Sequence, residues 1–336
     1  MSSFSIQNAF HDFNGRLSAS SAGKILVSAI AFICAGAMLA SSASASDRQQ
    51  VTLNFEALIN GQPFRCGEAY PQVGLKAAAI VPTDFRFFVS GIELVRRDGK
   101  AVPLALEQDG RWQVDDIALL DFEDGAGPCR NGSPALNTTV RGSIPKADYS
   151  GLRFILGVPF ERNHADPTLA PAPLNQTAMF WNWRGGYKFL KFDTTTVPMA
   201  GTPSTGAPGA GTHGDGGAAT SGQAAHAGGH GRVPGYSIHL GSTVCTSPSP
   251  TVAPSACANS NRVTVQFDPF DPVRSVIVAD IGRILARSDV SSNAPGTSPG
   301  CMSFPKDADC PPIMGALGLD YDGQRAAGPQ SLFSLR

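Results

Sequence analysis

The chain has few charged residues and almost no net charge. Charged residues make up 16 % of its 336 residues, and 26 Lys and Arg nearly balance 27 Asp and Glu. A basic patch that neutralises phosphates is therefore not expected, which argues against nucleic acid as a partner. The same balance gives no electrostatic reason to dock on an anionic membrane surface.

Motifs of common metal sites and hydrolases are also scarce. The cysteines form no C-x2-C pair of the kind that binds zinc. Asp121, Glu123 and Asp124 are close in sequence but do not form a D-x-D-x-D-G calcium loop. Ser242 stands in a Leu-Gly-Ser-Thr run rather than a nucleophile elbow. A catalytic triad of Asp121, His239 and Ser242 is thus a weak candidate, and we do not expect a conventional enzyme.

The N-terminus has the pattern of a secretion signal. Lys24 precedes an apolar run over residues 25–40, and small residues follow up to Ala43-Ser-Ala45. This order predicts a signal peptide over residues 1–45, which places the mature protein in the periplasm or outside the cell. The alternative is a membrane anchor, but the run is short for a spanning helix. After cleavage no membrane contact is expected.

The cysteines fit an oxidising compartment. Of the seven cysteines, Cys34 falls in the leader, which leaves Cys66, Cys129, Cys245, Cys257, Cys301 and Cys310. An even number in an exported chain predicts disulfides rather than thiolate ligands. Neighbours in sequence suggest Cys245–Cys257 and Cys301–Cys310, which leaves Cys66–Cys129, although other connectivities are open.

Short runs that alternate apolar and polar residues dominate the chain between turns. They occupy residues 51–57, 85–95, 117–122, 151–158, 236–240, 263–267 and 273–278. Together with 37 Gly and 26 Pro, these runs predict an all-β fold, a β-sandwich with long loops. Residues 179–192 suggest a hairpin around a glycine turn. Helical spacing is limited to residues 281–287, after a capping Asp280, and to a short C-terminal turn within residues 307–318.

One segment does not fit a hydrophobic core. Residues 200–234 are almost all Gly, Ala, Ser, Thr and Pro, and contain His213, His226 and His230. Such a composition predicts a disordered insertion within a single domain over residues 46–336. The three histidines are secondary candidates for metal binding, or an unselected feature of a loop.

Two histidines remain in the predicted folded part. His164 follows a strand in a polar loop, and His239 lies in or at the end of another strand. Two imidazoles from distant segments are able to bind a late transition metal, or each is an ordinary loop or core histidine. Trp181 and Trp183 stand two apart in a strand-like run, so both point to one face, as aromatic residues of a core also do.

Several longer motifs occur in a recognisable order. They are FRCG at residues 64–67, TDFRFFVS at 83–90, LDFE at 120–123, GLRFILGVPFERNH at 151–164, MFWNWRGGYKF at 179–189, HLGSTVC at 239–245 and GCMS at 300–303. In this order the chain resembles the MbnP-like family, also described as metallo-mystery pair four-Cys motif proteins. The resemblance covers roughly residues 51–320. The pairs Cys66 with Cys129 and Cys245 with Cys257 match the family's four-Cys style, whereas the long Gly/His insertion departs from it.

The resemblance implies a periplasmic copper-binding protein for copper storage, buffering or homeostasis. It implies one copper ion, Cu(I), held by His164, His239 and a kynurenine formed by oxidation of Trp181 or Trp183. A di-haem cytochrome of the c-peroxidase/MauG type is implied as the partner that oxidises the tryptophan. The alternatives are a copper redox enzyme and a β-sandwich interaction module without metal.

Overall fold

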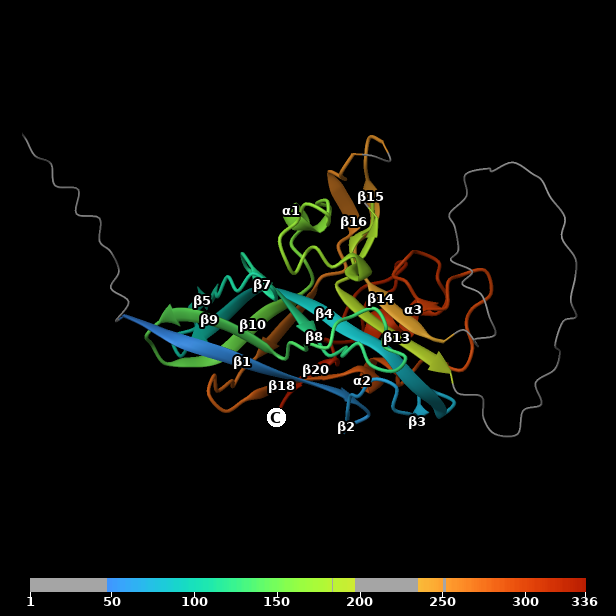
Figure 1. Cartoon of the computed structure of the whole chain (residues 1–336), viewed down its shortest axis with the longest axis horizontal. Helices are drawn as coiled ribbons and strands as arrows, with labels where there is room; N and C mark the ends of the chain where they lie inside the picture. Colours follow the sequence, from blue (N-terminus) through green and yellow to red (C-terminus); the bar gives the residue numbers. More distant parts are fainter. Residues whose placement is uncertain (1–46, 183, 197–234, 250–251) are drawn as a thin grey trace, which may run out of the picture. The chain divides into compact units, whose positions relative to one another are not determined.

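The computed structural model describes residues 47–182, 184–196, 235–249 and 252–336 (Figure 1). The predicted leader over residues 1–45, the Gly/His-rich segment with His213, His226 and His230, and Trp183 lie outside these residues. One compact unit spans Ser44–Arg336. Its described residues are mostly strands with few helices, which confirms the all-β prediction. Among them, no helix is both long and apolar enough to cross a membrane.

The first sheet has the order β20-β18-β1-β9-β6, with β2 paired to β1. Its strands are β1 (Arg48–Ile59), β2 (Gln62–Pro63), β6 (Ala105–Leu106), β9 (Thr139–Pro145), β18 (Val276–Asp280) and β20 (Phe333–Leu335). β1 runs parallel to β18 and antiparallel to β9. The first sheet therefore joins segments from both ends of the described chain.

The second sheet has the order β17-β10-β4-β13-β14-β19. These strands are β4 (Ala78–Arg96), β10 (Tyr149–Leu156), β13 (Leu190–Thr196), β14 (Ser237–Leu240), β17 (Val263–Phe267) and β19 (Gly300–Cys301). Shorter strands add to β4 and β8, namely β3 (Tyr70–Val73), β5 (Ala101–Pro103), β7 (Gln113–Val114) and β8 (Ile117–Asp121). The long β4 is thus the centre of the second sheet.

Two short hairpins stand apart from the large sheets. One pairs β11 (Phe180–Asn182) with β12 (Gly186–Tyr187), and the other pairs β15 (Thr243–Thr246) with β16 (Ala256–Asn259). The first confirms the hairpin expected around the glycine turn, but only in a short form. The strand that follows, β13, belongs to the second sheet instead.

Phenylalanine rings join the two large sheets into a sandwich. The Phe55 ring of β1 lies 6.1 Å from that of Phe87 in β4 and 6.0 Å from that of Phe154 in β10. The Phe333 ring of β20 lies 5.4 Å from Phe87 and 5.3 Å from Phe154. Edge-to-face packing at these separations is the favoured geometry for aromatic pairs, so the four rings hold one sheet against the other.

The helical segments named among the described residues are short, and two of them lie where the sequence predicted helical spacing. Asp280 caps α2 (Ile281–Leu285) by accepting from Gly282 N at 3.0 Å, and α3 spans Cys310–Ala316. The same carboxylate accepts from Asn60 N and Gly61 N, both at 2.9 Å, and so fixes the β1–β2 turn as well. The sequence missed α1 (Phe160–Asn163) and a 3-10 turn, η2 (Thr177–Met179), because both are too short to show a period.

All three disulfides suggested by the sequence are present. They join Cys66 to Cys129, Cys245 to Cys257, and Cys301 to Cys310. The second lies across the β15–β16 hairpin, between directly paired residues. The third ties β19 to the start of α3.

Candidate metal centre

His164 lies at the C-terminal end of α1 and is 5 % exposed. Its Nε2 is 3.2 Å from Asn163 Nδ2 and 3.4 Å from Cys257 Sγ, and the Phe160 ring is 5.3 Å away. Asn163 Oδ1 accepts from Tyr187 N at 2.9 Å, which ties this loop to β12. His164 is therefore held against the Cys245–Cys257 disulfide of the second hairpin.

His239 lies in β14, opposite Lys191 of the neighbouring β13. Its side chain is 14 % exposed, and its Nε2 is 2.8 Å from Asp193 Oδ1. Its backbone carbonyl accepts from Ser303 Oγ at 2.9 Å. The imidazole is thus fixed by a carboxylate on one nitrogen, which is the usual arrangement for a histidine that binds metal with the other.

Trp181 of β11 lies beside His239. The two ring centroids are 6.5 Å apart, and the Trp181 ring is 5.6 Å from that of Phe304. A Cβ on Gly241 would come within 2.5 Å of Trp181 Cζ3, so glycine lets the indole lie against the chain just after β14. Trp181 is half-buried and outside the hydrophobic core, so its interpretation as a core aromatic is wrong.

A pocket of about 250 Å³ lies nearby, but none of His164, His239 and Trp181 lines it. It is lined by Asn182, Arg184, Gly185, Ser242, Thr243, Val244, Cys245 and Phe304. Phe304 packs on Trp181, and Cys245 belongs to the disulfide that His164 contacts. The lining therefore includes one neighbour of Trp181 and one cysteine of the disulfide that His164 contacts.

A buried layer of charged side chains lies on the two strands next to His239, β13 and β4. It is on the face of the second sheet opposite the phenylalanine core. Arg86 and Asp84 are fully buried and form an ion pair, in which Arg86 Nε donates to Asp84 Oδ1 at 2.8 Å. Lys191 Nζ contacts Asp84 and lies 3.0 Å from Asp193 Oδ2. Since Asp193 in turn contacts His239, a continuous row of polar contacts runs from β4 to β14.

These contacts shift the pKa values of Asp193 and Lys191. Burial alone would raise the pKa of Asp193, but His239 and Lys191 hold it well below its usual value. Burial would lower the pKa of Lys191, but Asp193 and Asp84 raise it. Asp193 and Lys191 therefore stay ionised.

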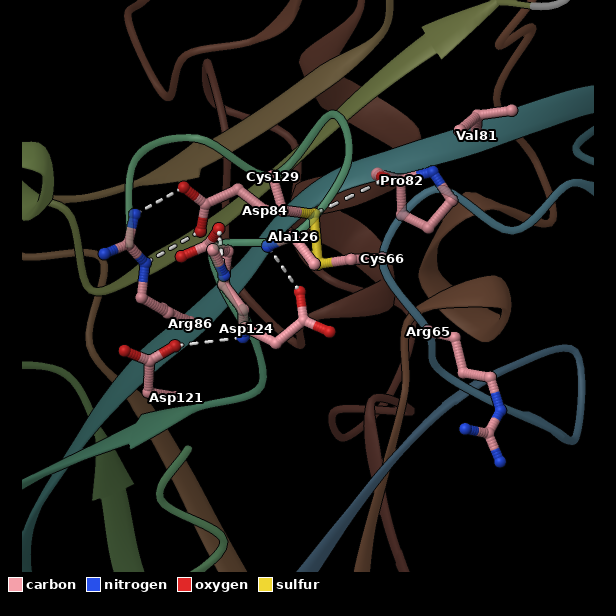
Figure 2. Close-up of a disulfide and its surroundings, with 12 residues drawn as sticks. Arg65, Cys66, Val81, Pro82, Asp84, Arg86, Asp121, Asp124, Ala126 and Cys129 are labelled. Carbon is pink, nitrogen blue, oxygen red and sulfur yellow. Dashed lines mark hydrogen bonds and ion pairs between the residues drawn. A yellow bond between two sulfur atoms is a disulfide. The ribbon is translucent and has the colours of Figure 1, made fainter. Parts of the chain in front are cut away.

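Asp121 behaves differently at the other end of the layer. Burial raises its pKa to about 7, against the attraction of Arg86. Figure 2 shows Arg86 directed at Asp84, with Asp121 beside them and the Cys66–Cys129 disulfide close by. Asp121 Oδ1 accepts from Glu123 N at 3.0 Å, so this carboxyl group is part of the turn that follows β8.

The catalytic triad and the calcium site are not assembled from the residues considered. The carboxylate that contacts His239 is that of Asp193 rather than Asp121, and Ser242 Oγ donates to Ser260 O at 3.0 Å. Asp124 Oδ1 accepts from Ala126 N at 3.0 Å within its own loop. The sequence missed Asp193 and Lys191 as partners of His239, because alternation of charged and apolar residues usually marks a solvated strand face.

Comparison with known proteins agrees with the resemblance. A model of the MbnP family matches residues 48–303. The structure is similar to that of "MbnP from Methylosinus trichosporium", with 30 % sequence identity and a TM-score of 0.68, over 86 % of this chain and 98 % of that chain. No match was found among curated proteins.

Proposed function

This chain belongs to the MbnP family, and from that premise we propose that it is a periplasmic protein that binds one copper ion for storage or buffering. Family membership supports metal binding. The observation that carries the proposal is the contact between His239 and Trp181. The pocket beside them is lined in part by Cys245, whose disulfide partner Cys257 contacts His164. The ligands are His164, His239 and a kynurenine derived from one tryptophan.

The donor set fits copper. Neutral imidazole suits copper well, and both histidines are largely removed from solvent. Conversion of tryptophan to kynurenine opens the indole ring and leaves an aromatic amine and a ketone, which supply donor atoms that tryptophan lacks. The imidazole and aromatic-amine nitrogens are borderline donors that suit copper. That the bound ion is Cu(I) is part of this proposal. Trp181 is one candidate for this oxidation because it contacts His239. Trp183 is the other candidate.

The oxidation requires a partner, since this chain has no oxidant of its own among the described residues. We assign that role to a di-haem cytochrome of the c-peroxidase/MauG type, which would act on the exported protein. Phe304 is 48 % exposed and packs on Trp181, so an approach from this side would bring the partner within one aromatic ring of the indole.

Loss of either histidine tests the copper site. His164→Ala and His239→Ala should each abolish tight Cu(I) binding, measured by competition with a chromogenic Cu(I) chelator. Deletion of residues 200–234, with its three histidines, is the matched control and should leave one tight site. The proposal is wrong if both alanine variants hold copper as tightly as the parent protein.

Intact mass tests the modification. Formation of kynurenine adds about 4 Da, because one carbon is lost and one oxygen gained. Protein produced with the cytochrome should carry this change, and peptide mapping should locate it at Trp181 or Trp183. Protein produced alone should lack the change and bind copper weakly. Equal affinity of the two preparations would refute the role of kynurenine while leaving a copper site of two histidines.

A further inference from the structure

The surroundings of His239 determine which of its two nitrogens is free. Nε2 is 2.8 Å from Asp193 Oδ1, and the other oxygen of that carboxylate is 3.0 Å from Lys191 Nζ. Asp193 and Lys191 are two apart in β13 and so project from the same face, and Lys191 is directly opposite His239 in the sheet. The three side chains form one connected row on adjacent strands.

Lys191, the member of this row nearest to β4, also contacts buried charges. Lys191 also contacts Asp84, and Asp84 is paired in turn with Arg86. The Lys191 side chain is 4 % exposed and those of Asp84 and Arg86 are fully buried. Because Lys191 has carboxylates on two sides, its ammonium group is not free to turn away from Asp193.

Donor and acceptor chemistry then fixes the proton on His239. An ammonium group only donates, so Asp193 Oδ2 accepts from Lys191. An ionised carboxylate has no hydrogen to donate, so Asp193 Oδ1 also accepts, and His239 Nε2 must carry a hydrogen. In a neutral imidazole only one nitrogen is protonated, which leaves the lone pair on Nδ1.

We propose that His239 offers Nδ1 rather than Nε2 to the metal, and that Asp193, oriented by Lys191, is the positioning residue that fixes this tautomer. The metal part rests on the proposed copper function. The tautomer part does not, because it follows from the contacts among His239, Asp193 and Lys191 and needs no metal. Carboxylate partners of this kind orient the ring and raise the basicity of the nitrogen that binds metal.

Asp193→Asn inverts the tautomer without changing the shape of the side chain. Lys191 requires an acceptor, so the amide oxygen of the new side chain should face Lys191 and its NH2 group should face His239. Nε2 then accepts, Nδ1 gains the hydrogen, and the lone pair for the metal is lost. We expect Cu(I) affinity to fall about 10- to 100-fold, the usual effect of removing such a partner.

Two readouts test the inference: the Cu(I) affinity, and the tautomer of His239 in copper-free protein. 15N NMR of copper-free protein, at a pH where the imidazole is neutral, should show Nε2–H for His239 in the parent and Nδ1–H in Asp193→Asn. Asp98→Asn, at an exposed turn, is the control and should change neither readout. Adding Lys191→Met to Asp193→Asn frees the amide to turn, and should restore Nε2–H at least in part.

The outcomes separate this inference from the copper function. An Nδ1–H tautomer in the parent protein, or a parent-like tautomer and affinity in Asp193→Asn, overturns the inference even if copper binds. Absence of copper binding in a parent protein that shows Nε2–H overturns the proposed function instead. The parent spectrum alone tests the tautomer if the variant fails to fold.

Discussion

Asp84 neutralises two buried cations, and its removal should be costly. The side chain of Asp84 is fully buried, accepts from Arg86 Nε at 2.8 Å, and contacts Lys191. Asp84→Asn keeps the shape of the side chain but removes its charge, so no cavity forms. The effect on stability is therefore electrostatic: two cations lose their shared counterion within the protein.

The expected loss is large for a near-isosteric change. Removing one partner of a buried ion pair costs about 3–5 kcal/mol of unfolding free energy. For a domain of this size each kcal/mol lowers Tm by about 2–4 °C, so the loss corresponds to roughly 6–20 °C. Denaturant unfolding and calorimetry of copper-free, disulfide-intact protein measure both quantities.

A surface aspartate provides the comparison. Asp98 Oδ2 is 3.9 Å from Arg96 Nε and both side chains are exposed. Asp98→Asn should change stability by less than about 0.5 kcal/mol. If Asp84→Asn costs less than about 1 kcal/mol, the reasoning fails, and Asp121 and Glu123, which also attract Arg86, are sufficient to balance its charge.

Two further results are expected. The pKa of Asp121 is raised by burial to about 7, so the folded protein holds this proton while the unfolded chain releases it, and stability falls as pH rises from about 4 to 7. Asp121→Asn should flatten unfolding free energy against pH over that window; an unchanged slope would contradict the shift. Gly241→Ala would place Cβ 2.5 Å from Trp181 Cζ3 and 2.8 Å from Tyr187 O, and should displace the indole. Tryptophan fluorescence and Cu(I) affinity should both change, whereas Gly315→Ala, with open space around it, should alter neither.

Local sequence patterns were sufficient to predict many of the strands and two of the helices. The alternating run at residues 51–57 lies within β1, and residues 263–267 form β17. Asp280 caps its helix as expected because an N-cap depends on neighbouring residues only. The run at residues 273–278 was placed too early: Val273 is 85 % exposed, and β18 begins at Val276.

The candidate metal site was only partly predictable from the sequence. His164 and His239 were predicted as ligands from their residue type and from the family motifs, but the partners of His239 were not predicted. Lys191 and Asp193 alternate with apolar residues, and such alternation predicts a face in contact with water. The face is buried because segments distant in sequence cover it. Arg86 Nη1, for example, donates to Asn131 O in the loop that contains Cys129.

That covering loop gives the Cys66–Cys129 disulfide a role beyond holding two segments together. The bond closes a loop of 63 residues and lies next to Pro82, two positions before Asp84. In chain-entropy terms it stabilises the native state by about 4 kcal/mol. Protein made in a reducing cytosol would lack that contribution. If the loop that contains Cys129 then moved away, water would hydrogen-bond to Arg86 and Asp84. Formation of this disulfide would therefore help to keep water away from the buried charges that lead to His239.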